Sequence, residues 1–423
     1  MPVPGTRAPE VALSEPPSSA TPSSSATPSG PVTSSDSAPT PRRGAAPRRP
    51  APLAGALARL RPAAFGAQPT GERLARIRRS PQYRDGAFRN DRPVRMGDLR
   101  TMPAMLRQLA RREDRLRRSP LRRPPTVRPA WLETPEPPAS GLRLTWLGHA
   151  SVLAEIDGHR VLFDPVFAER CSPFSFVGPR RLHPLPILPA ELGPVDAVVI
   201  SHDHYDHLDM ATVRTLVAGE AVFAVPLGVG AHLEHWGVPA SRIVELDWHE
   251  STRVGGLTLT AEPGQHFCGR GLFGRWQTLW ASWVVAGPEH RIYHSGDTGY
   301  FPGFAKTGQE HGPFDATMIQ IGAYSEEFWP DIHMTPEQGV RAHLDLAAGG
   351  EPGLLLPIHW GTFNLGPHAW DEPVELTLSA AEREDVPVTV PRPGGSVEPA
   401  APPEPDPWWR AVARPAAAPG AGR

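Results

Sequence analysis

Cysteine is almost absent from this sequence, since its 423 residues include only Cys171 and Cys268. Two cysteines cannot form a disulfide framework for a chain of this length, so we expect a reducing compartment. No apolar run reaches about 18 residues, and the first residues lack a charged region followed by an apolar stretch. These absences predict neither a transmembrane helix nor a secretory signal, and favour a cytoplasmic protein.

Lysine and histidine are also unevenly distributed. Lys306 is the single lysine among 43 basic residues, which is typical of a GC-rich coding sequence and weakens any argument from arginine content alone. No histidine occurs in the first 148 residues, and all 17 lie between His149 and His368. Chemistry is therefore expected within residues 149–368.

Charge divides the chain in two, although the formal net charge is only −2. Residues 42–128 contain 24 arginines and 6 acidic residues, whereas the rest of the chain contains 19 basic and 39 acidic residues. A basic segment is thus joined to an acidic body. No nucleic-acid partner is expected for the chain as a whole.

Proline is abundant, at 54 residues, and is concentrated near the two ends. Residues 1–70 are rich in Pro, Ser and Ala, a composition that buries too little apolar surface to offset the entropy of ordering, so they predict a disordered arm. Residues 399–423 predict a disordered tail for the same reason. Within it, Trp408 and Trp409 either dock on the body or form a short exposed apolar end.

Residues 71–130 form the basic segment, and Thr101–Arg118 within it predicts an amphipathic helix. Its apolar residues recur near helical spacing, with arginines over much of the rest. These apolar residues are Met102, Leu106, Leu109 and Leu116. The apolar side either packs on the body or contacts an anionic membrane surface or another partner.

Residues 131–398 predict one α/β catalytic domain, because short β-branched runs alternate with helical patterns. The expected strands are 142–147, 151–156, 160–163, 197–200, 221–225, 257–261, 282–285, 291–294, 316–321 and 353–357. The expected helices are 209–218, 228–237 and 335–347. The last should begin at Thr335, which offers a hydroxyl cap followed by proline.

Four possible metal ligands follow the strand predicted at 197–200, within the sequence SHDHYDH of residues 201–207. Imidazole nitrogens and carboxylate oxygens suit a divalent ion such as zinc. A tight turn would let His202 and His204 bind one ion while Asp206 and His207 bind a neighbour. Further donors should follow later strands, and His266, Asp297 and His359 each do so in a glycine-flanked turn.

This ordered set resembles the metallo-β-lactamase superfamily, and the resemblance implies an α/β fold arranged as a four-layer αβ/βα sandwich. It also implies two Zn²⁺ ions, or other divalent metals. Carried over residue by residue, the first ion is held by His202, His204 and His266, and the second by Asp206, His207 and His359, with Asp297 bridging them.

Two further residues are expected to lie behind these ligands. Asp164 matches a superfamily aspartate beneath the metal site, where it would accept a ring N–H from a ligand histidine. A turn-forming Asp-Pro is the competing interpretation. His149 lines the site or is a structural histidine.

The flanking motifs resemble the N-acylphosphatidylethanolamine-hydrolysing phospholipase D family from about residue 81 to about residue 374. They include WLGHAS at 146–151, QHFC at 265–268, GDTGY at 296–300 and HWGTF at 359–363. The resemblance implies a phosphodiester hydrolase that releases N-acylethanolamine and phosphatidic acid through a metal-bridging hydroxide, with Asp206 and Asp297 at the reacting centre. His333 matches a family histidine expected to bind phosphate or donate a proton. A plain helix-capping segment is the alternative.

A phospholipid substrate requires an apolar surface near the metals. Phe174, Phe176, Val177, Leu182, Leu185, Ile187 and Leu188 lie beside Arg180 and Arg181, a combination suited to acyl chains and phosphates, although packing on the body is equally consistent. Membrane contact would then be peripheral, on the inner face, assisted by the basic segment. The resemblance also allows a homodimer.

Three other functions remain open. A lactonase or another small-ester hydrolase would share the ligand pattern and would not need an apolar surface. A nuclease could use the basic segment to contact phosphates, but the body is acidic. A non-enzymatic scaffold is the third, and the complete ligand set argues against it.

Overall fold

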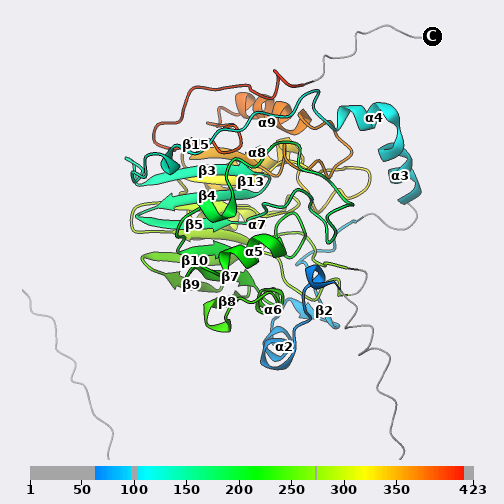
Figure 1. Ribbon diagram of the computed structural model, residues 1–423, viewed down its shortest axis with the longest axis vertical. Coiled ribbons are helices and arrows are strands. Elements are labelled where there is room, and N and C mark those ends of the chain that lie inside the picture. The colour runs from blue at the N-terminus through cyan, green and yellow to red at the C-terminus, as the bar shows by residue number, and fades with distance from the viewer. Residues whose placement is uncertain (1–61, 97–101, 272–273, 414–423) are drawn as a thin grey trace, which may run out of the picture. The chain divides into compact units, whose positions relative to one another are not determined.

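The computed structural model describes residues 62–96, 102–271 and 274–413 (Figure 1). Its first sheet has seven strands in the order β15-β3-β4-β5-β6-β7-β8. These strands are β3 (Leu142–Gly148), β4 (Ser151–Ile156), β5 (His159–Phe163), β6 (Ala197–Val199), β7 (Val222–Pro226), β8 (Ile243–Leu246) and β15 (Ser396–Val397). The pairs from β5 to β8 are parallel, whereas β15, β3, β4 and β5 pair antiparallel.

The second sheet has six strands in the order β14-β13-β12-β11-β10-β9. They are β9 (Ser251–Val254), β10 (Leu257–Glu262), β11 (Ser282–Ala286), β12 (Arg291–His294), β13 (Ala316–Gln320) and β14 (Leu354–Ile358). The strands β12, β13 and β14 are parallel, and the other pairs are antiparallel. All ten strands that the sequence predicts are present, so those predictions are confirmed.

Helices accompany both sheets, and Figure 1 shows α5 in green and α8 and α9 in orange. The helices of the body are α5 (Met210–Leu216), α6 (Gly230–His235), α7 (Gly303–His311), α8 (Pro336–Leu346) and α9 (Glu372–Arg383). The predicted start of α8 is confirmed, because the Thr335 hydroxyl accepts a hydrogen bond from the backbone N–H of Gln338. Short 3-10 turns lie at Ala63–Phe65, Ala130–Leu132, Pro189–Glu191 and Ala240–Arg242.

Strand alternation places the two sheets face to face. In β4, Val152 and Ala154 belong to a core shared with strands of the second sheet, while Leu153 between them belongs to a core shared with α5 and α6. A third core joins the outer side of the second sheet to α7, α8 and α9. The result is the four-layer αβ/βα sandwich that the sequence predicts.

Residues before the body form smaller elements. They are α2 (Gly71–Ile77), the hairpin β1 (Tyr83–Arg84) and β2 (Ala87–Phe88), α3 (Met102–Ala110) and α4 (Arg112–Arg117). The single helix expected over 101–118 is therefore two helices, with Arg111 between them. No helix among the described residues is long and apolar enough to span a bilayer.

The predicted disordered ends need correction where the structure describes them, while residues 1–61 and 414–423 lie outside the described residues. The arm does not extend to residue 70: the indole N–H of Trp236 donates to the Ala63 carbonyl at 2.8 Å. The tail does not begin at 399, because Trp408 and Trp409 are both 2% exposed. Composition alone predicted disorder in these segments, because it does not reveal the few aromatic contacts that anchor them to the body.

Trp408 is the main anchor of the C-terminal segment. Its ring stacks on Trp360 at a centroid distance of 5.5 Å, and Trp360 in turn stacks on Trp146 of β3 at 5.6 Å. Since Trp360 directly follows His359, this stack fixes one side of the metal-ligand edge described below.

Trp408→Ala should lower the free energy of unfolding by about 3–5 kcal/mol, because it leaves a cavity in this aromatic stack. Urea denaturation of the full chain measures the change. Leu376→Ala, on the surface of α9 where the side chain is 36% exposed, is the matched control. Equal losses for the two variants would contradict the docked arrangement of the segment.

Candidate metal centre

One edge of the sandwich collects the candidate ligands. His149 follows β3, Asp164 follows β5 and the 201–207 loop follows β6 in the first sheet. In the second sheet, His266 follows β10, Asp297 follows β12 and His359 follows β14. These strands run in the same direction within each sheet. The fold therefore brings residues from across the whole body to a single place.

The first group of side chains consists of His202, His204 and His266. The Nδ1 of His204 lies 2.8 Å from the Nε2 of His202 and 3.3 Å from the Nε2 of His266. The three nitrogens face one another closely enough to bind one metal ion. His202 and His266 are completely buried, so they face protein and not solvent.

The second group consists of His149, Asp206, His207 and His359, all buried. The Oδ2 of Asp206 lies 3.1 Å from the Nε2 of His149, 3.2 Å from that of His359 and 3.5 Å from that of His207. His149 is thus placed among the possible ligands, with its ring nitrogen as close as theirs. From the sequence, only a lining or a structural role was expected for His149.

Asp297 lies between the two groups. Its Oδ2 is 3.1 Å from the Nε2 of His359 and 3.2 Å from that of His207, and 3.9 Å and 3.8 Å from those of His202 and His266. The other oxygen, Oδ1, is buried without a hydrogen-bond partner. One carboxylate therefore faces both groups, as a bridging ligand must.

Electrostatics link these groups strongly. Burial opposes ionisation of Asp297, but His207 and His359 outweigh it and hold the pKa of that carboxyl well below its usual range. Burial likewise lowers the pKa of His359, yet Asp297 and Asp206 raise it to about 9. Protons on His207 and His359, whose pKa values are raised, thus compensate the buried carboxylates when no cation does so, and cation binding would displace them.

The donor set fits divalent metal ions. It contains only imidazole nitrogens and carboxylate oxygens, the ligands that zinc and similar ions take. Two of the facing atoms, the Nε2 of His207 and the Oδ1 of Asp297, are buried and lack hydrogen-bond partners. Such atoms are costly in a folded protein unless a further group binds them.

Asp164 holds the 201–207 loop in place through Ser201 and His207. Its Oδ2 accepts hydrogen bonds from the Nδ1–H of His207 at 2.7 Å and from the Ser201 hydroxyl at 2.6 Å, and its Oδ1 accepts from the Ser201 backbone N–H. This bond leaves the Nε2 of His207 free to face the centre. The contact is the one that the sequence analysis expected of Asp164.

His266 is held from two sides. Its Nδ1–H donates to the Ile332 carbonyl at 3.0 Å, and its backbone N–H and C=O both bond to the amide side chain of Asn90. Asn90 lies 176 residues away in the sequence. No local pattern could have identified it as part of the site.

His333 lies at the rim of the centre. Its Nε2 is 4.0 Å from the Oδ2 of Asp297, and its side chain is 11% exposed. Burial, only partly opposed by Asp297, lowers the pKa of His333 to about 4. The imidazole is therefore neutral at neutral pH.

A hydrogen-bonded chain behind His149 is a further part of the site that the sequence does not indicate. The Thr362 hydroxyl accepts from the backbone N–H of His149 at 2.6 Å and contacts the Nε2 of His183 at 2.9 Å. Burial lowers the pKa of His183 to about 3. The HWGTF motif contains Thr362, but nothing in the sequence indicates its partner.

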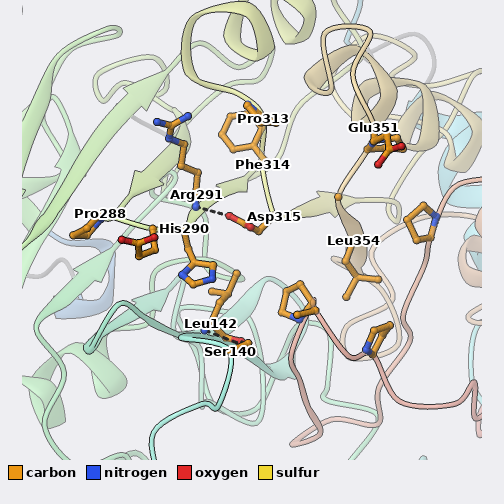
Figure 2. A pocket seen from close by; sticks show the side chains of 17 residues that line it. Ser140, Leu142, Pro288, His290, Arg291, Pro313, Phe314, Asp315, Glu351 and Leu354 are labelled. Carbon is orange, nitrogen blue, oxygen red and sulfur yellow. Dashed lines mark hydrogen bonds between the residues drawn. The ribbon is translucent and has the colours of Figure 1, made fainter. Parts of the chain in front are cut away.

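A hollow of about 570 Å³ lies elsewhere, around the start of β12, β13 and β14 (Figure 2). Figure 2 shows Arg291 and Asp315 in its wall, where the Arg291 backbone N–H donates to the Asp315 carboxylate at 2.8 Å. None of the predicted site residues lines it. The candidate chemistry is thus confined to the opposite ends of these strands.

Comparison with known proteins agrees with this geometry. The model of the beta-lactamase superfamily domain matches residues 159–360, which include all seven predicted ligands. The chain belongs to the metallo-β-lactamase superfamily. As a member of this superfamily it is a metal-dependent hydrolase.

The chain is also similar to individual proteins and to solved structures. An uncharacterized protein of Mycobacterium tuberculosis is 52% identical over 355 residues, covering 82% of this chain and 92% of the relative. The N-acyl-phosphatidylethanolamine-hydrolyzing phospholipase D 1 of Caenorhabditis elegans is 40% identical over 238 residues, covering 54% of this chain and 66% of the relative. The structure of a metallo hydrolase from Ignicoccus hospitalis aligns with a TM-score of 0.46 at 22% identity, covering 60% of this chain and 97% of that one.

Asp164→Asn should weaken divalent-metal binding, measured with zinc, about 10- to 100-fold. One of the two acceptor oxygens becomes an N–H donor, so the hydrogen bonds from His207 and Ser201 can no longer all form and the His207 ring is oriented less well. Competition with a chromophoric chelator measures the affinity. Asp196→Asn changes an exposed carboxylate just before β6 and serves as the control. An unchanged affinity in Asp164→Asn would show that Asp164 does not position His207.

Proposed function

We propose that this protein is a dizinc phosphodiesterase of the phospholipase D type, which cleaves N-acylphosphatidylethanolamine to N-acylethanolamine and phosphatidic acid. The observation that carries the proposal is the position of the Oδ2 of Asp297, within 4 Å of ring nitrogens from both ligand groups. In this arrangement His202, His204 and His266 would hold the first ion. Asp206, His207 and His359 would hold the second, and Asp297 would be shared.

Two such ions, when bound, lower the pKa of water and neutralise charge on a phosphoryl group. The protein keeps their ligands in place: Asp164 fixes the ring of His207, and the Ile332 carbonyl fixes that of His266. Because these residues are buried, little reorganisation is needed when a substrate arrives. His149, beside Asp206, completes the wall of the second site and offers it a further nitrogen.

His333 is our candidate for contact with the substrate. It lies at the rim of the centre, 4.0 Å from Asp297 and with 11% of its side chain exposed, and its low pKa keeps the ring neutral. A neutral imidazole can donate its N–H to a phosphoryl oxygen. This favours phosphate binding by His333 over donation of a proton from an imidazolium.

The choice of substrate rests on the relatives and on the flanking motifs. The relative from C. elegans bears the name of an N-acylphosphatidylethanolamine hydrolase, and its similarity covers 54% of this chain. Metal ligands alone are shared by hydrolases of many esters. The phospholipid would be reached from a membrane surface, with the protein bound peripherally.

The zinc-loaded protein should release N-acylethanolamine and phosphatidic acid from N-acylphosphatidylethanolamine in mixed micelles, detected by mass spectrometry. Chelation should abolish both products because it removes the metal, and Asp297→Asn should do so because the charge of the shared carboxylate ligand is lost. Asp315→Asn, an exposed carboxylate at the opposite ends of the strands, should retain activity.

If the protein binds two zinc ions per chain but cleaves no lipid, the proposed metal centre stands and the proposed substrate is contradicted. Lactones would then be tested next. Fewer than two ions in an active enzyme would contradict the dinuclear centre instead.

A further inference from the structure

A second hollow, of about 570 Å³, lies between two segments that are distant in sequence, 118–123 and 179–182. Five arginines line it, together with Leu121, Leu182, two prolines, a serine and an asparagine. The arginines are Arg118, Arg122, Arg123, Arg180 and Arg181. No carboxylate belongs to its lining within the described part of the chain.

Arg181 is the most buried of these arginines, at 7% exposure. The carbonyl oxygens of Val166 and Ala168 accept hydrogen bonds from it at 2.5 and 3.3 Å, and its Nη1 is buried without a hydrogen-bond partner. Burial lowers its pKa to about 10, so it is still charged at neutral pH. A fixed positive charge therefore lies in the wall of the hollow.

The other arginines are open to solvent to different degrees. Arg122 and Arg123 are exposed, and Arg118 is half-buried. Arg180 forms an ion pair with Glu169 in which both side chains are more than half exposed, an arrangement that contributes little stability. Guanidinium groups gathered in this way repel one another and bind a phosphate through paired N–H donors.

Exposed apolar side chains gather in or just before the same two segments. The described residues contain seven large apolar side chains that are exposed, and five of them lie at 116–121 or 174–177. They are Leu116, Leu121, Phe174, Phe176 and Val177, with Phe176 at 79% exposure. The surfaces of soluble proteins rarely contain such a group of exposed apolar residues. Apolar side chains beside arginines are typical of surfaces that insert into a lipid interface.

We infer that this hollow binds the phosphomonoester head group of an anionic lipid, with the apolar side chains at 116–121 and 174–177 inserted among the acyl chains around it. A phosphomonoester presents up to two negative charges and several oxygens, which matches a cluster of guanidinium groups better than a singly charged diester does. The inference is independent of the ester that the metal centre cleaves. The hollow lies outside the two ligand groups, and no predicted metal ligand lines it.

Vesicle binding tests this inference directly, with the full chain carrying Asp297→Asn so that no lipid is consumed. Phosphatidylcholine vesicles containing phosphatidic acid should bind more tightly than vesicles given the same surface charge with phosphatidylglycerol. The double change Arg122→Gln with Arg123→Gln should weaken binding to phosphatidic acid about thirtyfold, given the usual attraction of each arginine to an anionic surface.

Arg214→Gln with Arg253→Gln, two exposed arginines on α5 and β9, is the matched control and should bind like the parent. Phe176→Ser should weaken vesicle binding and leave thermal stability unchanged. Equal binding to both anionic vesicles, or equal loss in the control pair, would overturn a specific head-group site. Glycerol 3-phosphate that binds as tightly as the vesicles would assign the hollow to a soluble phosphomonoester and overturn the lipid.

Discussion

The negative charge of Asp297 is the constraint around which the rest of the site is arranged. A carboxylate that is 5% exposed, at the meeting point of two sheets, is unfavourable without compensating positive charge. The protein surrounds it with the ring nitrogens of five histidines, which are His202, His207, His266, His333 and His359. The negative charge of such a cluster is balanced either by protons or by metal ions, and the geometry of its donor atoms favours metal ions.

The fold creates this meeting point by running the ligand-bearing strands in one direction within each sheet. Each of these strands is buried in the central core, so its position is set by packing against the opposite sheet. The turn after each strand then needs only a short length of chain to present its donor. Asp164 and the stacked Trp146, Trp360 and Trp408 fix the rings and the backbone beneath this edge.

Much of this arrangement could be predicted from the sequence, because the strands and the ligands that follow them are both indicated by local patterns. Buried strands have a clear apolar pattern, and each ligand follows directly after one, as in the 201–207 loop. The strands β8, β9 and β15 were missed, since they are short or less apolar and lie at sheet edges. The docking of Trp408 was left open, because composition cannot say where an isolated aromatic side chain will pack.

Contacts between distant segments could not be predicted. Asn90 brackets His266 across 176 residues, and His183 reaches Thr362 across 179. The arginine hollow has the same origin, since segments 118–123 and 179–182 meet only after folding. The sequence indicated that each segment was basic, and the structure shows that they face one another.

The anomalous diffraction of crystals of the zinc-loaded protein at the zinc edge tests the central claim most directly. The account predicts two anomalous peaks about 3.5–4 Å apart, one beside His202, His204 and His266 and the other beside Asp206, His207 and His359, with Asp297 between them. A single peak in fully loaded crystals, or two peaks that do not share Asp297, would contradict it.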